Sequence, residues 1–503
     1  MLTNPLFAID FYKVDHRRQY PEGTTEIYSN FTPRFVKPCH SLLTDFDNKV
    51  VVFGIQKFIK EFLIEHFDAG FFNRKRTQVI HEYKILIEEA LGIKDFDCWH
   101  LHKLHESGYL PIEIKALEEG TRVPIGVPIL SVVNTQPDFF WLTNYLETII
   151  SASLWKPITC ATIAFEFKRL LTRYANETGS DLSFVPYQAH DFSYRGMSGG
   201  EDARLCSAAH LTSFKGTDCV SAIELLNLYY SGRELGDIVG SSVPATEHSV
   251  MSAGGKIDEF NTIKRLITEI YPDGIVSIVC DTYDFWQVLT SYLPSLHNEI
   301  NAREGKLIVR PDSGNPLDII CGDEIELEGS PARKGALQLL WETFGGRVNK
   351  EGYKELNPKI GLIYGDAITV ERASLILETM KVQGFASSNI VFGVGSFTYQ
   401  YITRDTFGFA MKATSAVING ERKAIFKEPK TQAGGTDKRS AKGLLKVDMD
   451  METATYILHE NVSKEIEQTG CLETVFKDGK WLNEVTLKTI RENLSLELEL
   501  ALS

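Results

Sequence analysis

Short apolar runs that end in glycine, aspartate or arginine recur along the middle of the chain. They are residues 275–281 (IVSIVCD), 306–314 (KLIVRPDSG), 360–366 (IGLIYGD) and 389–396 (NIVFGVGS), with a less apolar run at 184–192 (FVPYQAHDF). Consecutive Val, Ile, Leu or Phe residues suit strands that are covered on both faces. Each run therefore predicts a buried strand.

Segments with apolar residues at i, i+3 and i+4 spacing lie near these runs and predict helices at 217–232, 283–300, 333–346 and 369–385. Strands that alternate with helices favour an α/β fold with a parallel sheet and right-handed crossovers. We predict an irregular βα barrel, whose active site lies at the carboxyl ends of the strands. A doubly wound open sheet, with its crevice at the same ends, is the alternative.

The two ends of the chain have a different pattern. Strand-like pieces such as 110–117 (LPIEIKAL) and 127–133 (VPILSVV) lack the regular alternation with helices. We therefore expect an accessory α+β layer from residues 1–147 and 401–503 around a catalytic barrel at 148–400. The C-terminal part is also expected to complete a phosphate site.

Composition narrows the function. The chain has 503 residues, 43% of them hydrophobic and 24% charged, with a net charge of -14. An acidic total argues against a nucleic-acid partner. Eight scattered cysteines without a CxxC pair argue against a zinc site or a disulfide framework. With no apolar run of about 18 residues and no signal peptide, we expect no membrane span and a cytoplasmic enzyme.

Charged residues at the strand ends are the first candidates for chemistry. Arg310 offers a planar fork for phosphate, and Asp312 suits Mg²⁺ or a sugar hydroxyl. A salt-bridged turn is the alternative for an isolated RPD tripeptide. Asp281 ends the preceding apolar run. Similar polar residues at several strand ends favour a site.

Small residues follow two further runs. Gly365 precedes Asp366, and Gly393 and Gly395 flank a valine. Glycines let backbone N–H groups approach an anion, although a lone GxG is more often a plain turn. Basic residues follow at Arg404, Lys412, Lys427, Lys438, Arg439 and Lys442. This run suits a phosphate site, with a solvated basic loop as the alternative.

Three other residues are ambiguous from the pattern alone. Phe192, in HDFSYRG, suits the face of a flat electron-poor ring, or a place in the core. Asp218 begins a predicted helix, where an acid pairs with the helix dipole without any further role. His248, in SSVPATEHS, suits a nucleophile, a general base, a metal ligand or a plain loop residue.

The motifs HDFSYRG, FKGTD, SSVPATEHS, VCDTYD, RPDSGNP, YGD, FGVGS and TRD occur in this order. With DFYKVDHRRQYP near one end and RENLSLELE near the other, the chain resembles the nicotinate/nicotinamide phosphoribosyltransferase family, with its type II fold, over essentially its whole length. The resemblance implies transfer of phosphoribosyl from phosphoribosyl pyrophosphate to nicotinamide. It also implies Mg²⁺, ATP as co-substrate through a phosphohistidine, and a homodimer with shared active sites.

The resemblance also implies roles for the residues. Phe192 and Tyr12 of the second subunit would sandwich the pyridine, and Asp218 would accept the carboxamide N–H, which rejects nicotinate by charge repulsion. Further nicotinamide contacts would come from Arg195, Ser242, Ala245 and Arg310. Ribose and phosphate contacts would come from Asp10, Arg34, Arg310, Asp312, Gly365, Asp366, Gly393, Gly395, Arg404, Lys412 and Lys427.

By the same resemblance, His248 is the phosphorylated residue, Glu247 and Asp281 are the candidates to orient it, and Asp281 and Asp312 would hold Mg²⁺, directly or through water. The chain departs from its relatives at Ser193, Thr246, the Ser396-Phe397 pair and Ala410. Nicotinate phosphoribosyl transfer is the nearest alternative activity. A sugar-phosphate isomerase or aldolase, and a signalling protein without catalysis, are alternatives of other classes.

Overall fold

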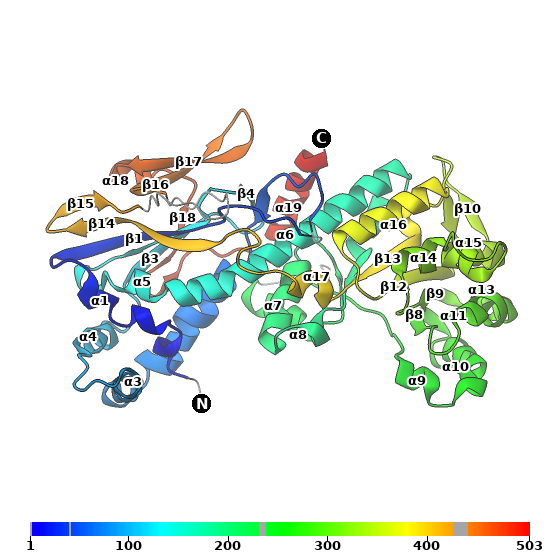
Figure 1. Ribbon diagram of the computed structural model, residues 1–503, viewed down its shortest axis with the longest axis horizontal. Coiled ribbons are helices and arrows are strands. Elements are labelled where there is room, and N and C mark those ends of the chain that lie inside the picture. Colours follow the sequence, from blue (N-terminus) through cyan, green and yellow to red (C-terminus); the bar gives the residue numbers. More distant parts are fainter. Residues whose placement is uncertain (1–2, 40–41, 231–237, 427–440, 503) are drawn as a thin grey trace.

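The computed structural model describes residues 3–39, 42–230, 238–426 and 441–502. In this part of the chain the strands gather into two main sheets near opposite ends of an elongated molecule (Figure 1). One sheet is parallel and comes from the middle of the sequence. The other is antiparallel and comes from its two ends.

The parallel sheet has the order β7-β6-β13-β12-β9-β8, and each neighbouring pair is parallel. Its strands are β6 (Ala189–Asp191), β7 (Gly216–Thr217), β8 (Asp273–Val279), β9 (Glu304–Arg310), β12 (Ile360–Tyr364) and β13 (Ile390–Val394). The prediction of an α/β fold with a parallel sheet is confirmed. Because the strands run in one direction, the polar residues that follow them meet at one edge.

The two edges of this sheet are connected through residues 241–246. On one side Thr217 of β7 donates its N–H to the Ser241 carbonyl at 3.0 Å. On the other side Ser277 of β8 donates to the Pro244 carbonyl at 2.9 Å. Both contacts belong to isolated parallel bridges. The sheet is therefore curled, unlike the open, doubly wound alternative, and the two edges converge on one segment.

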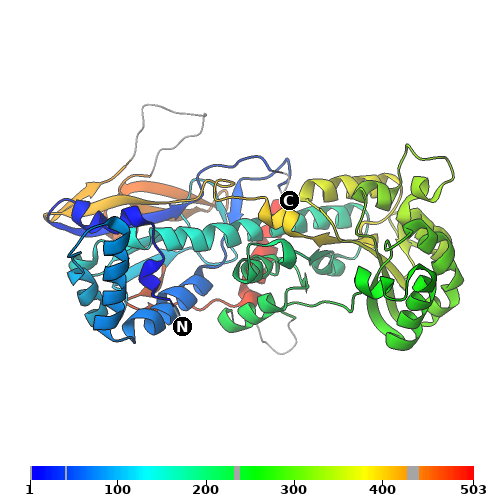
Figure 2. The ribbon, with the colours of Figure 1, turned by 60° about the horizontal axis from the view of Figure 1, so that its bottom comes forward.

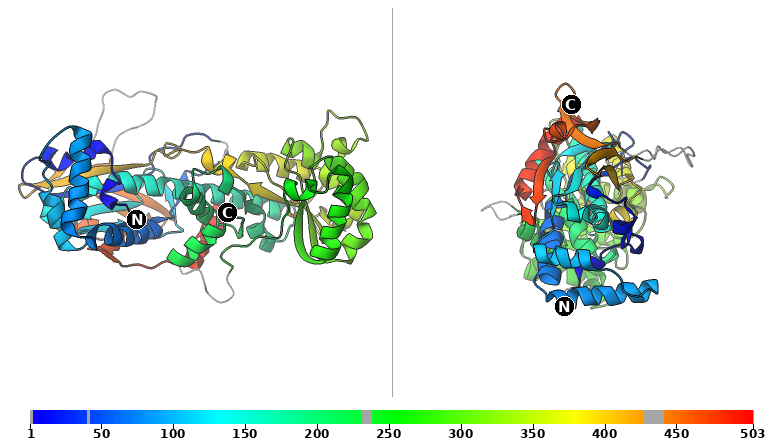
Figure 3. Two further views of the ribbon diagram at one scale, coloured as in Figure 1. Left: turned by 90° about the horizontal axis from the view of Figure 1, so that it is seen from below. Right: turned by 90° about the vertical axis from the view of Figure 1, so that its left-hand side faces the viewer.

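The antiparallel sheet has the order β15-β14-β1-β5-β3-β18-β19. Figures 2 and 3 show its blue and cyan strands from the N-terminal part beside orange strands from the C-terminal part. Its strands are β1 (Thr24–Thr32), β3 (Ile112–Ala116), β5 (Leu130–Asn134), β14 (Ala410–Ile418), β15 (Glu421–Ala424), β18 (Glu473–Lys477) and β19 (Lys480–Trp481). Three two-stranded sheets pair β2 (Lys49–Val51) with β4 (Arg122–Pro124), β10 (Gly346–Val348) with β11 (Lys354–Leu356), and β16 (Leu444–Asp450) with β17 (Thr455–Val462).

Helices cover both sheets and lie between them. Those of the two ends are α1 (His16–Gln19), α2 (Ile55–Phe58), α3 (Arg76–Leu91), α4 (Trp99–Ser107), α5 (Leu142–Tyr145), α18 (Lys464–Glu467) and α19 (Leu487–Leu502). Those of the middle are α6 (Glu147–Glu177), α7 (Gly200–His210), α8 (Val220–Tyr229), α9 (His248–Ser252), α10 (Glu259–Arg265), α14 (Pro316–Cys321), α15 (Pro331–Phe344), α16 (Val370–Val382) and α17 (Ser396–Gln400).

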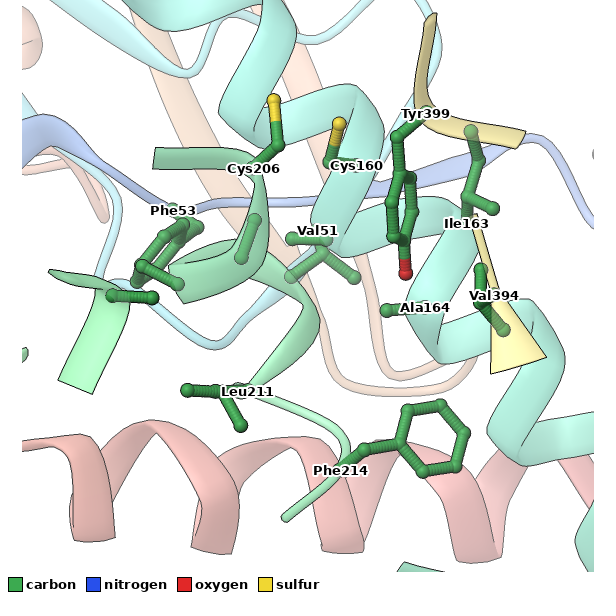
Figure 4. Packing of buried hydrophobic residues seen from close by; sticks show 14 of the residues in the cluster. Val51, Phe53, Cys160, Ile163, Ala164, Cys206, Leu211, Phe214, Val394 and Tyr399 are labelled. Carbon is green, nitrogen blue, oxygen red and sulfur yellow. The ribbon is translucent and has the colours of Figure 1, made fainter. Parts of the chain in front are cut away.

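The long helix α6 joins the two parts of the molecule. It contacts β2 and β14 on one side and α7 and α16 on the other. By length and hydropathy α6 resembles a membrane span, but 61% of its apolar window is buried inside the structure. Figure 4 shows Cys160, Ile163 and Ala164 of α6 packed near Cys206 and Val394. Burial on this scale identifies α6 as a core helix.

Two predicted elements differ in the structure. The strand expected at 184–192 is mostly a 3₁₀ helix, Leu182–Tyr187, and only Ala189–Asp191 is a strand. Pro186 lies inside this turn and has no N–H for a strand ladder. The helix expected at 283–300 is divided into short helical pieces between Phe285 and Ala302, one of which starts beside Pro294.

Candidate active site

Residues from along the parallel strands, at their amino as well as their carboxyl ends, line a cavity of about 370 Å³ together with Ser241, Ser242, Val243 and Ala245. His190 comes from β6, Arg310 from β9, and Asp218 from the residue after β7. Much of the remaining wall is apolar or aromatic. It includes Phe184, Tyr187, Phe192, Val243, Ala245, Ile275, Ile308, Leu362, Ile363 and Val391. A cavity of this size whose wall combines aromatic and apolar side chains with polar groups such as Asp218 and Arg310 suits a small ring-shaped ligand.

Asp218 is held by two donors that come from different parts of the sheet. His190 Nε2 lies 2.8 Å from Asp218 Oδ1, and the Ser242 hydroxyl donates to the same oxygen at 2.7 Å. Partial burial raises the pKa of Asp218, but these hydrogen bonds and the charge of Arg310 outweigh it and lower the pKa overall. The carboxylate therefore stays ionised. Its side chain does not cap α8, whose first turn begins at Val220.

Phe192 lies where two strand-end glycines leave room for its ring. A Cβ added at Gly393 would lie 2.4 Å from a ring carbon of Phe192, a distance that side chains do not tolerate. A Cβ at Gly365 would lie 2.6 Å from Asp312 Oδ1. These glycines were predicted to bring backbone N–H groups to a phosphate. In the structure their small size also lets an aromatic ring and a carboxylate approach the strand ends.

His248 is the first residue of α9 and is 52% exposed at its side chain. Its Nδ1 lies 3.1 Å from the Thr282 hydroxyl, and its Nε2 lies 3.8 Å from Asp281 Oδ1. Glu247 instead accepts a hydrogen bond from Ser249. Of the two candidates for orienting His248, the geometry favours Asp281.

Asp281 and Asp312 form an acidic pair beside His248. Asp281 Oδ2 accepts the Asp312 N–H at 2.9 Å and the Ser313 hydroxyl at 2.5 Å. The Oδ1 atoms of both aspartates are buried without a hydrogen-bond partner, although Arg310 Nε lies 3.3 Å from Asp312 Oδ1 as an ion pair. Burial and the neighbouring Asp281 raise the pKa of Asp312, against Arg310 and His248. Unpartnered carboxylate oxygens fit the ligands that Mg²⁺ takes.

Several predicted phosphate residues lie together away from this cavity. Arg34 donates to the Gly408 carbonyl at 2.8 Å, and burial and the charge of Arg404 lower its pKa. Burial also lowers the pKa of Lys412, and the neighbouring positive charges of Arg34, Lys13 and Arg404 lower it further. The structure thus gathers a cationic cluster here. Lys427, with Lys438 and Arg439, lies outside the described residues.

The other predicted residues occupy varied places. Tyr12 is 63% exposed, and Asp10 accepts a hydrogen bond from Thr148 at 2.7 Å. Neither lines the cavity. Arg195 and Asp366 are exposed. Gly395 precedes the short helix α17. The departure at Ser396 places its side chain against Gly196, where an added Cβ would clash.

Three residues at the site were not among the candidates from the sequence. They are His190, Thr282 and Ser277, whose buried hydroxyl has no hydrogen-bond partner and whose residue lines the cavity. His190 and Asp218 are 28 positions apart and meet because His190 pairs with Gly216 across β6 and β7. The signal available in the sequence was that the dipeptides His190-Asp191 and Thr217-Asp218 lie at the carboxyl ends of two consecutive short strands.

Comparison with known families accounts for most of the chain. Residues 187–479 match the model described as the nicotinate phosphoribosyltransferase (NAPRTase) family. Residues 4–114 match the model described as the nicotinamide phosphoribosyltransferase N-terminal domain. The two matches together include the strands of the parallel sheet and most of the antiparallel one.

Two curated relatives align with most of this chain and with most of their own length. A nicotinamide phosphoribosyltransferase of Acinetobacter baylyi is 52% identical over 502 residues, which is 99% of this chain and 98% of the relative. One of Mycoplasma pneumoniae is 37% identical over 85% of this chain and 92% of the relative.

Among solved structures, the nicotinate-nucleotide pyrophosphorylase of Pyrococcus furiosus aligns with a TM-score of 0.55 at 14% identity. The alignment covers 99% of this chain and 96% of that one. At this identity the likeness establishes a shared fold.

Proposed function

The chain belongs to the nicotinate phosphoribosyltransferase family, and from this premise we infer that it transfers phosphoribosyl from phosphoribosyl pyrophosphate to nicotinamide. The products are nicotinamide mononucleotide and pyrophosphate, a step of NAD salvage. The relatives at 52% and 37% identity carry the name of this activity. The rest of the proposal concerns which residues perform it.

The observation that carries the choice of nicotinamide is the ionised Asp218 at the cavity wall. Its Oδ1 is hydrogen-bonded by His190 and Ser242, and its pKa is lowered. An anionic acceptor suits the N–H of a carboxamide. The carboxylate of nicotinate would meet a like charge at the same place, which disfavours it.

Phe192 beside Asp218 would place one face of the pyridine. With the amide held at Asp218 and the ring on Phe192, the pyridine nitrogen is oriented for in-line attack on C1 of the ribose, which gains much of the rate. Arg310 lines the same cavity and pairs with Asp312. It therefore links the base to the ribose side of the site, where Asp312 would bind the hydroxyls.

Asp281 and Asp312 are the proposed ligands of Mg²⁺, because each has a buried oxygen that accepts no hydrogen bond. When bound, the cation neutralises charge on the leaving pyrophosphate. Ser313 and the Asp312 N–H fix the other oxygen of Asp281, so that its Oδ1 stays directed toward His248. The two aspartates thus serve the sugar-phosphate side of the reaction.

His248 is the proposed carrier of a phosphoryl group from ATP. A neutral ring nitrogen attacks the γ-phosphorus, an N–P bond forms, the bridging P–O bond breaks and ADP leaves. Water later cleaves the N–P bond and releases phosphate. The exposure of His248 gives a nucleotide access, and Thr282 and Asp281 flank its two ring nitrogens.

The second face of the pyridine is proposed to come from Tyr12 of another copy of the chain. Tyr12 is exposed and absent from the wall of its own cavity, while the neighbouring Phe11 is 47% exposed. An exposed aromatic pair is a common feature of interfaces. A homodimer with shared sites, a cytoplasmic location and the use of ATP remain predictions.

The test is a product assay with phosphoribosyl pyrophosphate and Mg²⁺, using nicotinamide or nicotinate, with and without ATP. We expect nicotinamide mononucleotide as the main product. Asp218→Asn removes the charge at nearly constant size, so its preference for nicotinamide over nicotinate should fall by about tenfold or more. A preference for nicotinate in the unaltered protein would contradict the proposed substrate.

A further inference from the structure

His190, on β6, contacts the residue proposed to select the substrate and lines the same cavity. A carboxylate only accepts hydrogen bonds, so the 2.8 Å contact requires the hydrogen on His190 Nε2. The Ser242 hydroxyl donates to the same Oδ1 at 2.7 Å. Two donors thus converge on one oxygen of Asp218 from two directions.

The other oxygen of Asp218 is left for a ligand. No described residue donates a hydrogen bond to Oδ2, and the Asp218 side chain is 46% exposed where it lines the cavity. With Oδ1 engaged twice, the carboxylate cannot turn without losing both bonds. Oδ2 is therefore presented in one fixed orientation.

The imidazole of His190 is itself fixed by its neighbours. Gly216 is its register partner across the strands, and a Cβ there would lie 2.7 Å from His190 Nδ1. On another side the ring of Phe192 lies 4.9 Å away between centroids, tilted by 48°. His190 thus joins the aromatic face and the carboxylate that are proposed to hold the two halves of the substrate.

We propose that His190 is a positioning residue for substrate selection, whose Nε2–H, together with the Ser242 hydroxyl, occupies Oδ1 of Asp218 and leaves Oδ2 as the acceptor for a carboxamide N–H. This inference rests on the proposed function, in which nicotinamide is the substrate. It adds that the choice of amide over acid depends on a histidine that does not touch the reacting atoms.

A physical consequence distinguishes this role from simple packing. The groups facing Asp218 are His190 from β6, Ser242 from the connecting segment and Arg310 from β9. Without the histidine, the effect of burial on the pKa of Asp218 is less opposed, and a larger fraction becomes protonated as the pH falls. A protonated carboxyl donates a hydrogen bond to the nicotinate carboxylate. Loss of selectivity should therefore deepen at lower pH.

The experiment compares His190→Phe with His190→Gln in the full-length enzyme. Phenylalanine keeps a ring against Phe192 and Gly216 but has no donor, while glutamine keeps an N–H near the position of Nε2. The measured quantity is kcat/KM for nicotinamide divided by kcat/KM for nicotinate, from about pH 6 to about pH 8. We expect His190→Phe to lower this ratio by about tenfold, mostly through KM for nicotinamide. His190→Gln should restore most of it.

Ser242→Ala provides the matched comparison, because it removes the other donor to the same oxygen. It should lower the ratio by a smaller factor, since the contact with His190 lowers the pKa of Asp218 more than the Ser242 hydroxyl does. The ratio of the kcat/KM values for the two substrates is independent of the amount of folded enzyme. A thermal unfolding curve for each variant shows separately whether the substitution changes stability.

The outcomes are distinguishable. If the unaltered enzyme prefers nicotinate, the proposed function itself fails. If it prefers nicotinamide and His190→Phe keeps the same ratio at every pH, the positioning role is wrong while the function stands. Equal loss in His190→Phe and His190→Gln would show that ring packing, rather than the N–H, is what matters, and would overturn the proposal as well.

Discussion

Two sites with buried carboxylates differ in whether the chain supplies hydrogen bonds to all of the carboxylate oxygens. Glu119 lies in the loop between β3 and β4, and its side chain is buried. It accepts hydrogen bonds from the N–H groups of Gly54 at 2.8 Å and Gln56 at 2.6 Å, and from the Tyr230 hydroxyl at 2.9 Å. Burial raises its pKa to about 7 against these donors. The chain itself supplies every partner that Glu119 needs.

Asp281 and Asp312, at the ends of parallel strands, lack such a complete set of hydrogen bonds. Each keeps one buried oxygen without a hydrogen-bond partner. Buried polar atoms are normally satisfied, so an orphaned oxygen is a cost that the fold bears without benefit to its own stability. The chain itself therefore satisfies Glu119, whereas the free oxygens of the two aspartates are proposed to be satisfied by Mg²⁺.

The largest effect is expected at His248, the proposed nucleophile beside the aspartates. His248→Ala should abolish acid-labile ³²P uptake from γ-labelled ATP and the dependence of transfer on ATP. Glu247→Gln is the matched control and should retain the label, because Glu247 is bonded to Ser249 rather than to His248. Label that persists in His248→Ala would place the phosphoryl group elsewhere.

The next effect concerns the aspartates themselves. Asp281→Asn and Asp312→Asn should each lower kcat by about 100-fold or more, because they remove charge that meets the transition state. Their melting temperatures should change less than kcat does, because the buried Oδ1 atoms accept no hydrogen bond and asparagine keeps an oxygen for the bonds that Asp281 Oδ2 accepts. Steady-state kinetics at varied Mg²⁺ and a thermal unfolding scan measure both. A large loss of stability with normal kcat would make the pair structural, like Glu119.

A smaller effect tests whether Tyr12 of one subunit completes the active site of the other subunit. Tyr12→Ala and His248→Ala should each lack ATP-stimulated transfer alone. After subunit exchange, the mixture should recover about a quarter of the normal activity, because half of the dimers would contain one intact site. Exchange is verified by native mass spectrometry with one isotope-labelled partner. No recovery in exchanged dimers would remove Tyr12 from the neighbouring site.

The smallest effect on activity is expected at Glu119. Glu119→Gln places an amide where N–H donors point, and should lower the free energy of unfolding by about 1–3 kcal/mol with kcat unchanged. Because its pKa is raised when folded, the stabilisation from protonating Glu119 is complete below the unfolded pKa and is lost as the pH rises through about 7. Denaturant unfolding at several pH values should show this decline in the unaltered protein and not in the variant.

Sequence patterns were sufficient to predict four of the six parallel strands, β8, β9, β12 and β13, but not β7, and they gave β6 only in part. The runs at 275–281, 306–314 and 360–366 contain the observed strands β8, β9 and β12 within a few residues. Continuous apolar runs are a strong signal, because strands covered on both faces leave no room for polar residues. The helix at 369–385 was likewise found as α16.

The part that the pattern could not give is contact between residues far apart in the chain. His190 and Asp218 meet through strand register, and the sequence shows only that each follows a short apolar piece. Thr282 and Glu247 both neighbour a candidate residue, yet only Thr282 contacts His248. Side-chain direction at a strand end depends on the local turn, which periodicity does not describe. The resemblance to a known family supplied the roles instead.

The segment 241–246, which bonds to both edges of the parallel sheet, has a mechanical consequence. It carries Ser242 at the wall of the cavity, and two residues after it His248 begins α9. Proline at 244 has no N–H, so the segment is fastened to β8 chiefly through its carbonyl and through Thr246. Because hydrogen bonds fasten the segment to β7 at one end and to β8 at the other, Ser242 and the start of α9 are held in fixed positions on the same curled sheet.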